Sequence, residues 1–127
     1  MYDIAFDGSS GIISVRANAV LNAEEFARYA RELRHHVLRA RWRQGQVRIL
    51  VDATAGGVLP GDVAQGIAEL QRELLTGAHD RIAVIVSTSL QKLQVRRISL
   101  PGKGETFLSE SAARTWLSAY AHMDSAA

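Results

Sequence analysis

Residues 47–53 read Val-Arg-Ile-Leu-Val-Asp-Ala, a short run of β-branched and apolar side chains. Such a run, bounded by turn residues, is typical of a buried strand. A Gly- and Pro-containing loop follows at 54–61, and the spacing of Val63, Ile67 and Leu70 then predicts an amphipathic helix. A strand that leads through a loop into a helix is the repeating unit of parallel α/β sheets. The sequence therefore predicts an α/β protein with 47–53 at the centre of its sheet.

On the N-terminal side of this strand, alternating apolar residues predict two further strands, at 2–6 and 12–17. The five residues between them are turn-forming, which predicts an antiparallel hairpin. A helix is expected from 23 to about 40, with Asn22 as its N-cap. This helix would connect the hairpin to the central strand.

On the C-terminal side, strands and helices continue to alternate. The expected elements are a strand at 81–87, a helix at 90–97, a strand at 105–108 and a final helix that begins after Ser109. The complete order is ββαβαβαβα, which predicts a mixed five-stranded sheet with helices mainly on one face, because consecutive right-handed crossovers place helices on the same side. Residues 1–122 would form a single domain, and 123–127 a frayed tail.

The two faces of the predicted sheet differ in polarity. Val47, Ile49 and Val51 share an apolar face, whereas Arg48, Leu50 and Asp52 share a mixed one. With helices on the first face, the second would remain partly open. Its apolar side chains are Ile12, Leu50, Ala83 and Ile85. Because an exposed apolar strip usually marks an interface, this face predicts a homodimer.

The composition excludes several classes of protein. The chain has 127 residues, 47% of them hydrophobic and 22% charged, the balance of a soluble globular domain. It has no Cys, which rules out disulfides, thiolate metal sites and a cysteine nucleophile. The longest apolar run is too short to span a bilayer. Asp3 and Asp7 stand where a secretory leader would be basic, so we expect a cytoplasmic protein.

The element order and several segments resemble the STAS family, which includes the SpoIIAA-like anti-sigma-factor antagonists, and more narrowly the small bacterial STAS/SEC14-type proteins. The matching segments are the hairpin, the strands at 48–52 and 81–86, and residues 105–117, which read Glu-Thr-Phe-Leu-Ser-Glu-Ser-Ala-Ala-Arg-Thr-Trp-Leu. The last segment is similar to the family's final strand, polar turn and helix with an A-x-x-W-L ending. The resemblance covers nearly the whole chain. It implies a (βα) superhelical sheet and a regulatory or protein-interaction module without a built-in catalytic apparatus.

One motif departs from the family pattern. In the anti-sigma-factor antagonists, a phosphorylatable Ser lies after the central strand, in an Asp-Ser-Ser-Gly-like motif. Residues 52–62 of this chain read Asp-Ala-Thr-Ala-Gly-Gly-Val-Leu-Pro-Gly-Asp, so the Ser-Ser pair is absent and Thr54 is the only hydroxyl side chain. The resemblance therefore implies a module that lacks the usual phosphorylation motif.

Polar residues follow the two central strands at their carboxyl ends, where ligands of α/β sheets bind. This predicted rim consists of Asp52, Thr54, Gly56, Gly57, Ser87, Thr88 and Ser89. Its alternative interpretation is ordinary loop polarity.

An arginine-rich segment is the feature of the sequence that most strongly indicates a binding surface. Residues 28–48 contain seven arginines and a single acidic residue, Glu32, whereas the rest of the chain has eight basic and twelve acidic residues. On the helix, one outer stripe is formed by Arg28, Arg31, His35 and Arg39. It is either a solvated face with i,i+4 pairs such as Glu24–Arg28, or a docking stripe for an acidic partner or an anionic membrane. Nucleic acid is disfavoured, because no cluster of stacking aromatics accompanies it; Trp42 is expected to pack at the helix end.

No arrangement typical of an enzyme is found. The sequence lacks a G-x-S-x-G nucleophile motif, and Gly102-Lys103-Gly104 is not followed by the Ser or Thr of a phosphate-binding loop. His35 and His36 are adjacent and point about 100° apart on a helix, which does not suit one metal ion. We therefore expect no catalytic residues, no metal and no cofactor.

Three functions follow, in order of preference. The first is a non-catalytic STAS-like module that binds a protein partner or a second copy of itself. The second is a small-molecule or lipid carrier of SEC14-like type, which requires a cavity between sheet and helices, apolar with a few polar groups. The third is an enzyme whose residues come together only on folding.

Overall fold

The computed structural model describes residues 2–17 and 22–126, with side chains up to Ala119. Its elements alternate as the sequence predicts. They are β1 (Tyr2–Asp7), β2 (Ile12–Ala17), α1 (Ala23–Gln44), β3 (Arg48–Asp52), α2 (Gly61–Leu74), β4 (Arg81–Ile85), α3 (Ser89–Ile98), β5 (Gly104–Phe107) and α4 (Glu110–Ala126).

The five strands form one sheet in the order β1-β2-β3-β4-β5. Strand β1 pairs antiparallel with β2, and the other three pairs are parallel. The α/β class, the N-terminal hairpin and the central position of β3 are thus confirmed. Neighbouring strands follow one another in the sequence, so each parallel connection needs only one crossover helix.

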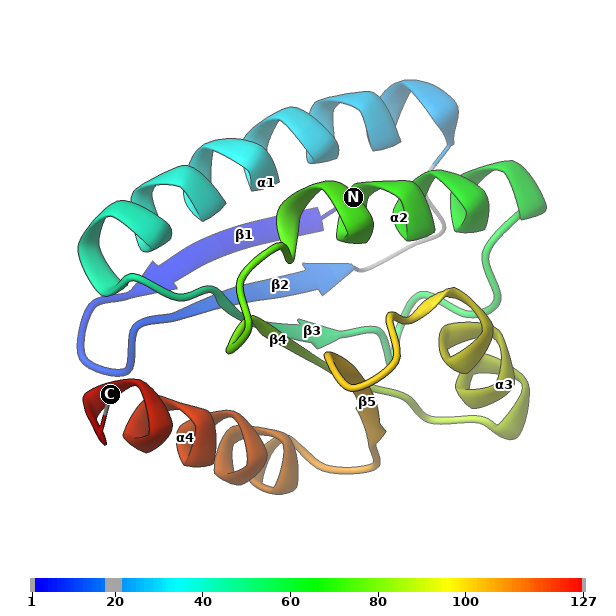
Figure 1. Cartoon of the computed structure of the whole chain (residues 1–127). Coiled ribbons are helices and arrows are strands. Elements are labelled where there is room, and N and C mark those ends of the chain that lie inside the picture. Colours follow the sequence, from blue (N-terminus) through cyan, green and yellow to red (C-terminus); the bar gives the residue numbers. More distant parts are fainter. Residues whose placement is uncertain (1, 18–21, 127) are drawn as a thin grey trace.

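The main core lies between the sheet and helices α1, α2 and α3. Ile13, Ile49 and Val84 project from the strands into this core, against Leu33 of α1 and Leu70 of α2. Figure 1 shows α1 and α2 side by side along one face of the sheet, with α3 beside them. Three of the four helices therefore cover the same face, as the repeated crossovers predict.

The prediction that the second face stays open is wrong for its apolar part. The four residues assigned to a dimer interface are buried, with relative exposures of 1%, 3%, 0% and 4% for Ile12, Leu50, Ala83 and Ile85. Ala113 and Leu117 of α4 cover them, and Figure 1 shows α4 on the side opposite α1 and α2.

The connectivity explains this placement. The crossover rule applies to a helix that connects two parallel strands. Among the described residues α4 makes no such connection, so the rule does not decide its side, and α4 packs where apolar surface is otherwise uncovered.

Several helix ends differ from those expected. Helix α1 continues to Gln44, four residues further, and ends at Gly45, whose φ of 77° is left-handed. A helix at 90–97 would place its N-cap at Ser89, but helix α3 begins at Ser89 and is capped by Thr88, whose hydroxyl accepts from the backbone N–H of Gln91. Helix α4 extends to Ala126, so residues 123–126 are helical, while residue 127 lies outside the described residues.

Candidate functional site

An apolar cavity of about 110 Å³ lies between the sheet and helices α1, α2 and α3. Strands β3 and β4 contribute Ile49 and Val84 to its wall, and the helices contribute Leu33, Leu70 and Val95. Well-packed cores contain few voids larger than a water molecule. An apolar cavity of this order of size, about 150 Å³ in one engineered case, stays dry and binds benzene or xenon. This cavity can therefore hold a small apolar molecule.

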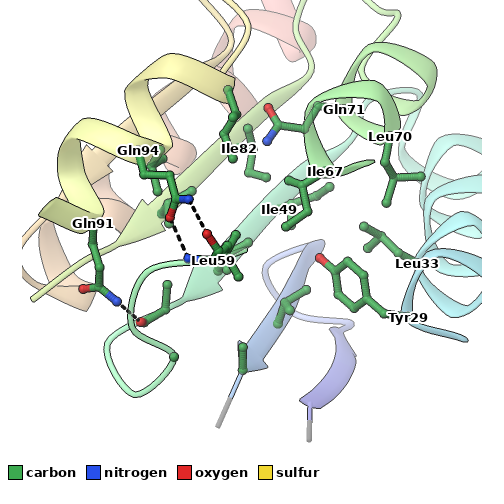
Figure 2. A pocket seen from close by; sticks show the side chains of 18 of the residues that line it. Tyr29, Leu33, Ile49, Leu59, Ile67, Leu70, Gln71, Ile82, Gln91 and Gln94 are labelled. Carbon is green, nitrogen blue, oxygen red and sulfur yellow. Dashed lines mark hydrogen bonds between the residues drawn. The ribbon is translucent and has the colours of Figure 1, made fainter. Parts of the chain in front are cut away.

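Two glutamines of α3 fasten the loop that follows β3 along one edge of the cavity. The Gln94 carboxamide donates to the carbonyl of Leu59 and accepts from its N–H, at 2.8 Å each, as Figure 2 shows. Gln91 donates to the carbonyls of Ala53 and Gly57, at 2.7 and 3.3 Å, and accepts from Ser87. The loop is thus held against α3 by two glutamines whose carboxamides already have hydrogen-bond partners within the protein.

Two other polar residues of the cavity wall, Gln71 and Tyr29, do not hold a loop in place. Gln71 of α2 is 7% exposed, and its Oε1 has no hydrogen-bond partner among the described residues. Tyr29 of α1 is 9% exposed, and its hydroxyl likewise makes no hydrogen bond within the described part of the chain. Figure 2 shows both extending from their helices toward the cavity. An apolar wall that includes a few polar residues is typical of a ligand site.

The cavity is electrically neutral. None of the described residues that line it carries a formal charge. Burial raises the pKa of the Tyr29 phenol above its ordinary value, with a smaller contribution from Tyr2, so the hydroxyl remains protonated at neutral pH.

The residues of the predicted rim lie at the carboxyl ends of β3 and β4, and three of them, Asp52, Thr54 and Ser87, are joined by hydrogen bonds. The Asp52 carboxylate accepts from the Thr54 hydroxyl at 2.6 Å, and the Ser87 hydroxyl donates to the Thr54 carbonyl at 3.2 Å. The Thr54 hydrogen bond, assisted by Arg16, lowers the pKa of Asp52. Gly56 and Gly57 line the cavity, so the rim is in part its edge.

The arginine-rich stripe lies on the outer face of α1, where Arg28, Arg31, His35 and Arg39 are all exposed. The predicted Glu24–Arg28 pair is present at 3.9 Å. Trp42 does not pack at the helix end as expected; it is 90% exposed, and Leu38, one turn before it, is 69% exposed. The outer face of α1 therefore combines the positively charged stripe with two exposed apolar side chains, Leu38 and Trp42.

A second, charged hollow of about 200 Å³ lies beside α4, over the part of the sheet that α4 leaves uncovered. Its arginines are paired, Arg16 with Asp52 at 3.7 Å and Arg114 with Glu110 at 3.2 Å. Among the described residues, no three His, Asp or Glu side chains gather closely enough to hold a metal ion. This hollow is a surface of ordinary ion pairs.

Sequence reasoning missed Gln71 and Tyr29. Both stand at apolar-face spacings, Gln71 four residues after Ile67 and Tyr29 four before Leu33. A polar residue at a core-facing position of a helix was the signal that could have found them.

Comparisons with known proteins define the fold. No protein-family model matches the chain, and no curated protein matches it either. A crystal structure from Shewanella loihica PV-4 is similar over 91% of this chain and 93% of that one, with 21% identity and a TM-score of 0.68. That structure is of an uncharacterised protein of the DUF3478 family with a SpoIIAA-like fold. The present chain is thus an α/β protein with a SpoIIAA-like fold, as the resemblance implied. Over the described residues, no helix is long and apolar enough to cross a membrane.

Proposed function

We propose that this protein is a non-catalytic STAS-like binding module whose ligand is a small, mainly apolar molecule held between the sheet and helices α1 to α3. The observation that carries the proposal is the cavity, because natural cores are otherwise closely packed. The second of the functions considered from the sequence is therefore preferred to the first. The single-domain boundaries at 1–122 and a cytoplasmic location stay predictions.

Filling the cavity tests this proposal. Val51 lies on the cavity wall and is half-buried, so Val51→Phe places an aromatic ring where the ligand would lie. Benzene, titrated into the wild-type protein, is expected to shift the backbone amide NMR signals of cavity residues such as Val15 and Val84. The Val51→Phe variant is expected to lose these shifts.

The matched control is Val58→Phe, the same change on a valine that is 48% exposed in the neighbouring loop. It should bind benzene like the wild type. Benzene shifts that persist in Val51→Phe, or that are spread evenly over the surface, would contradict a ligand site in this cavity.

A second candidate function is a protein interaction through the outer stripe of α1. It is favoured by Leu38 and Trp42, which are exposed among Arg31, His35 and Arg39. Aromatic residues and arginine are enriched at the centres of protein interfaces. The positive charge selects an acidic protein as the partner. A homodimer through Ile12 and Leu50 is not proposed, because α4 covers these residues.

A further inference from the structure

Two arginines of α1 are held by contacts within the protein. Arg34 forms a bidentate pair with Glu73 of α2, at 2.6 and 3.1 Å, and Arg41 pairs with the buried Asp80 at 2.7 Å. Hydrogen bonds between charged groups of this kind are among the strongest in proteins. Both pairs join α1 to neighbouring parts of the fold, so a structural role accounts for these two arginines.

The outer arginines of α1 form a row that such contacts do not explain. Arg31, His35, Arg39 and Arg43 follow one another at intervals of four residues, so they lie along one ridge of the helix. All four are exposed, and the three arginines make no ion pair with a described residue. This ridge is named the basic row. Its positive charge is not neutralised within the described part of the chain, and it can attract an acidic surface.

An apolar row runs beside the basic row. It consists of Leu38 and Trp42, which are also four residues apart and are 69% and 90% exposed. Leu38 lies three residues after His35, and Trp42 lies three after Arg39, so the two rows are neighbours on the helix surface. Trp normally buries most of its large apolar surface in a core or in an interface. An exposed Trp beside an exposed Leu therefore indicates a partner that covers both.

The shape of this surface fits another helix. Figure 1 shows α1 along the top of the molecule, with the sheet and α2 on its inner side. Parallel ridges of residues four apart leave a groove between them, into which a ridge of a second helix packs. From Arg31 to Arg43 the basic row is about 18 Å long, or about three turns. A partner helix with neighbouring acidic and apolar rows would match both rows at once.

A second copy of this chain does not offer such a helix. On α2, the exposed Glu69 and Glu73 are four residues apart, but Glu73 is already paired with Arg34. On α4, Glu110 pairs with Arg114 at 3.2 Å, and α3 contains no acidic residue. No helix in the described part of the chain therefore presents an unpaired acidic row, and the partner is a different protein.

We propose that the outer face of α1 binds an acidic amphipathic helix of another protein. Trp42 and Leu38 anchor its apolar side chains, and the basic row faces its carboxylates. This inference rests on the second of the proposed functions, the binding of an acidic protein, and specifies the form of that partner.

Two isomeric peptides test the proposal, each labelled with rhodamine and titrated into the full chain by fluorescence anisotropy at low salt. Both are alanine-based helices of about 18 residues, with glutamates in one row at intervals of four. The matched peptide has leucines in the neighbouring row, whereas its isomer has the same leucines on the side opposite the glutamates. Circular dichroism verifies that their helix contents are equal. The matched peptide is expected to bind about tenfold more tightly, since only it can cover Trp42 and Leu38 while its glutamates face the arginines.

Three single variants locate the effect. Trp42→Ala should reduce the preference for the matched peptide to less than about threefold, because the larger anchor is gone. Leu38→Ala should weaken binding of the matched peptide about threefold. Leu90→Ala is its control, because Leu90 lies on α3 and is 68% exposed, against 69% for Leu38. Leu90→Ala should leave the binding unchanged. All three residues are exposed, so the variants should fold like the wild type.

The outcomes separate this inference from the function on which it rests. Equal binding of the two peptides, lost in Arg31→Glu/Arg39→Glu, would overturn the helical partner and leave an acidic protein at this surface. A preference that persists in both Trp42→Ala and Leu38→Ala would overturn the anchors on α1. Binding of the protein to vesicles of phosphatidylserine and phosphatidylcholine, with no binding of either peptide, would replace the protein partner with an anionic membrane. If neither the peptides nor polyglutamate bind, the second proposed function itself fails.

Discussion

Asp80 carries a buried carboxylate that ties three segments of the chain together. It is 1% exposed, and it accepts hydrogen bonds from Arg41 Nη2 at 2.7 Å, from the Gly77 N–H at 2.7 Å and from the Val47 N–H at 2.9 Å. Burial alone would raise the pKa of Asp80, but the hydrogen bonds from Arg41, Gly77 and Val47 outweigh it and lower the pKa. The ionised form is therefore the one that stabilises the fold.

We predict that Asp80→Asn lowers the free energy of unfolding by about 2 kcal/mol at neutral pH, since hydrogen bonds to a charged group are lost in a buried position. Because the folded pKa lies below the unfolded value of about 3.9, this contribution is complete above that value and is lost as the pH falls through the folded pKa. Urea denaturation from about pH 6 to about pH 2 should show the wild type and variant converge in acid.

Glu73→Gln is the control, because it breaks an arginine–carboxylate pair of similar length, Arg34–Glu73 at 2.6 Å, that is about half exposed. It should change the free energy of unfolding by less than about 1 kcal/mol. Equal losses of unfolding free energy in the two variants would show that the buried hydrogen bonds of Asp80 stabilise the fold no more than an exposed ion pair does.

At the scale of residues, a hydrogen bond can be predicted from the sequence only when its partners are close together in the chain. The N-cap of α1 could be predicted, because Asn22 accepts from the Glu25 N–H three residues away and the contact is local. Asp80 has one local partner, Gly77, three residues away, but its other two partners are 33 and 39 residues away, and the partner of Gln94 is 35 residues away. Nothing in the local sequence around Asp80 or Gln94 specifies these distant partners.

At the scale of elements, the packing of α4 overturns the prediction of an exposed apolar face for a homodimer. Ala113 and Leu117 are four residues apart, which places them on one face of a helix, and both are fully buried. The amphipathic pattern thus predicted which side of the helix is buried, but not which face of the sheet it covers. That choice depends on where α1, α2 and α3 have already packed.

We predict that Leu117→Ala lowers the free energy of unfolding by about 3 kcal/mol, because it opens a cavity between α4 and strands β3 and β4. Urea denaturation measures this loss. Leu108→Ala is the control, since Leu108 is 82% exposed just before α4, and its effect should be within about 0.5 kcal/mol. A similarly small effect at Leu117 would mean that α4 does not seal the second face in solution.

At the scale of the whole molecule, the positive charge and the cavity lie on different parts of the structure. The exposed stripe of α1 faces outward, whereas Leu33 and Tyr29 of the same helix face the cavity. One helix therefore separates a neutral interior site from a basic surface. Binding of a partner at the stripe and of a ligand in the cavity are compatible in space.

Docking of an acidic partner at the stripe predicts a specific charge effect. Polyglutamate should bind the wild-type protein at low salt and be released as salt approaches about 0.1 M and above, where charges are screened beyond about 10 Å. The double variant Arg31→Glu/Arg39→Glu should bind it at least about tenfold more weakly, as measured by Trp fluorescence, because it reverses the local charge.

The control is Arg96→Glu/Arg97→Glu, which makes the same change in net charge on two exposed arginines of α3. It should retain most of the affinity. Equal weakening in both double variants would show that net charge alone, and not the stripe, attracts the acidic chain.

The sequence by itself determined the order of elements, the strand pairing and the apolar faces of the helices, because these depend on periodicity and on neighbours a few residues away. It also located the basic stripe, which one helix carries alone. Only the tertiary structure decided that α4 buries Ile12 and Leu50, and that Tyr29 and Gln71 face one cavity. Those outcomes depend on how closely separate elements pack, and packing between distant segments leaves no local pattern in the chain.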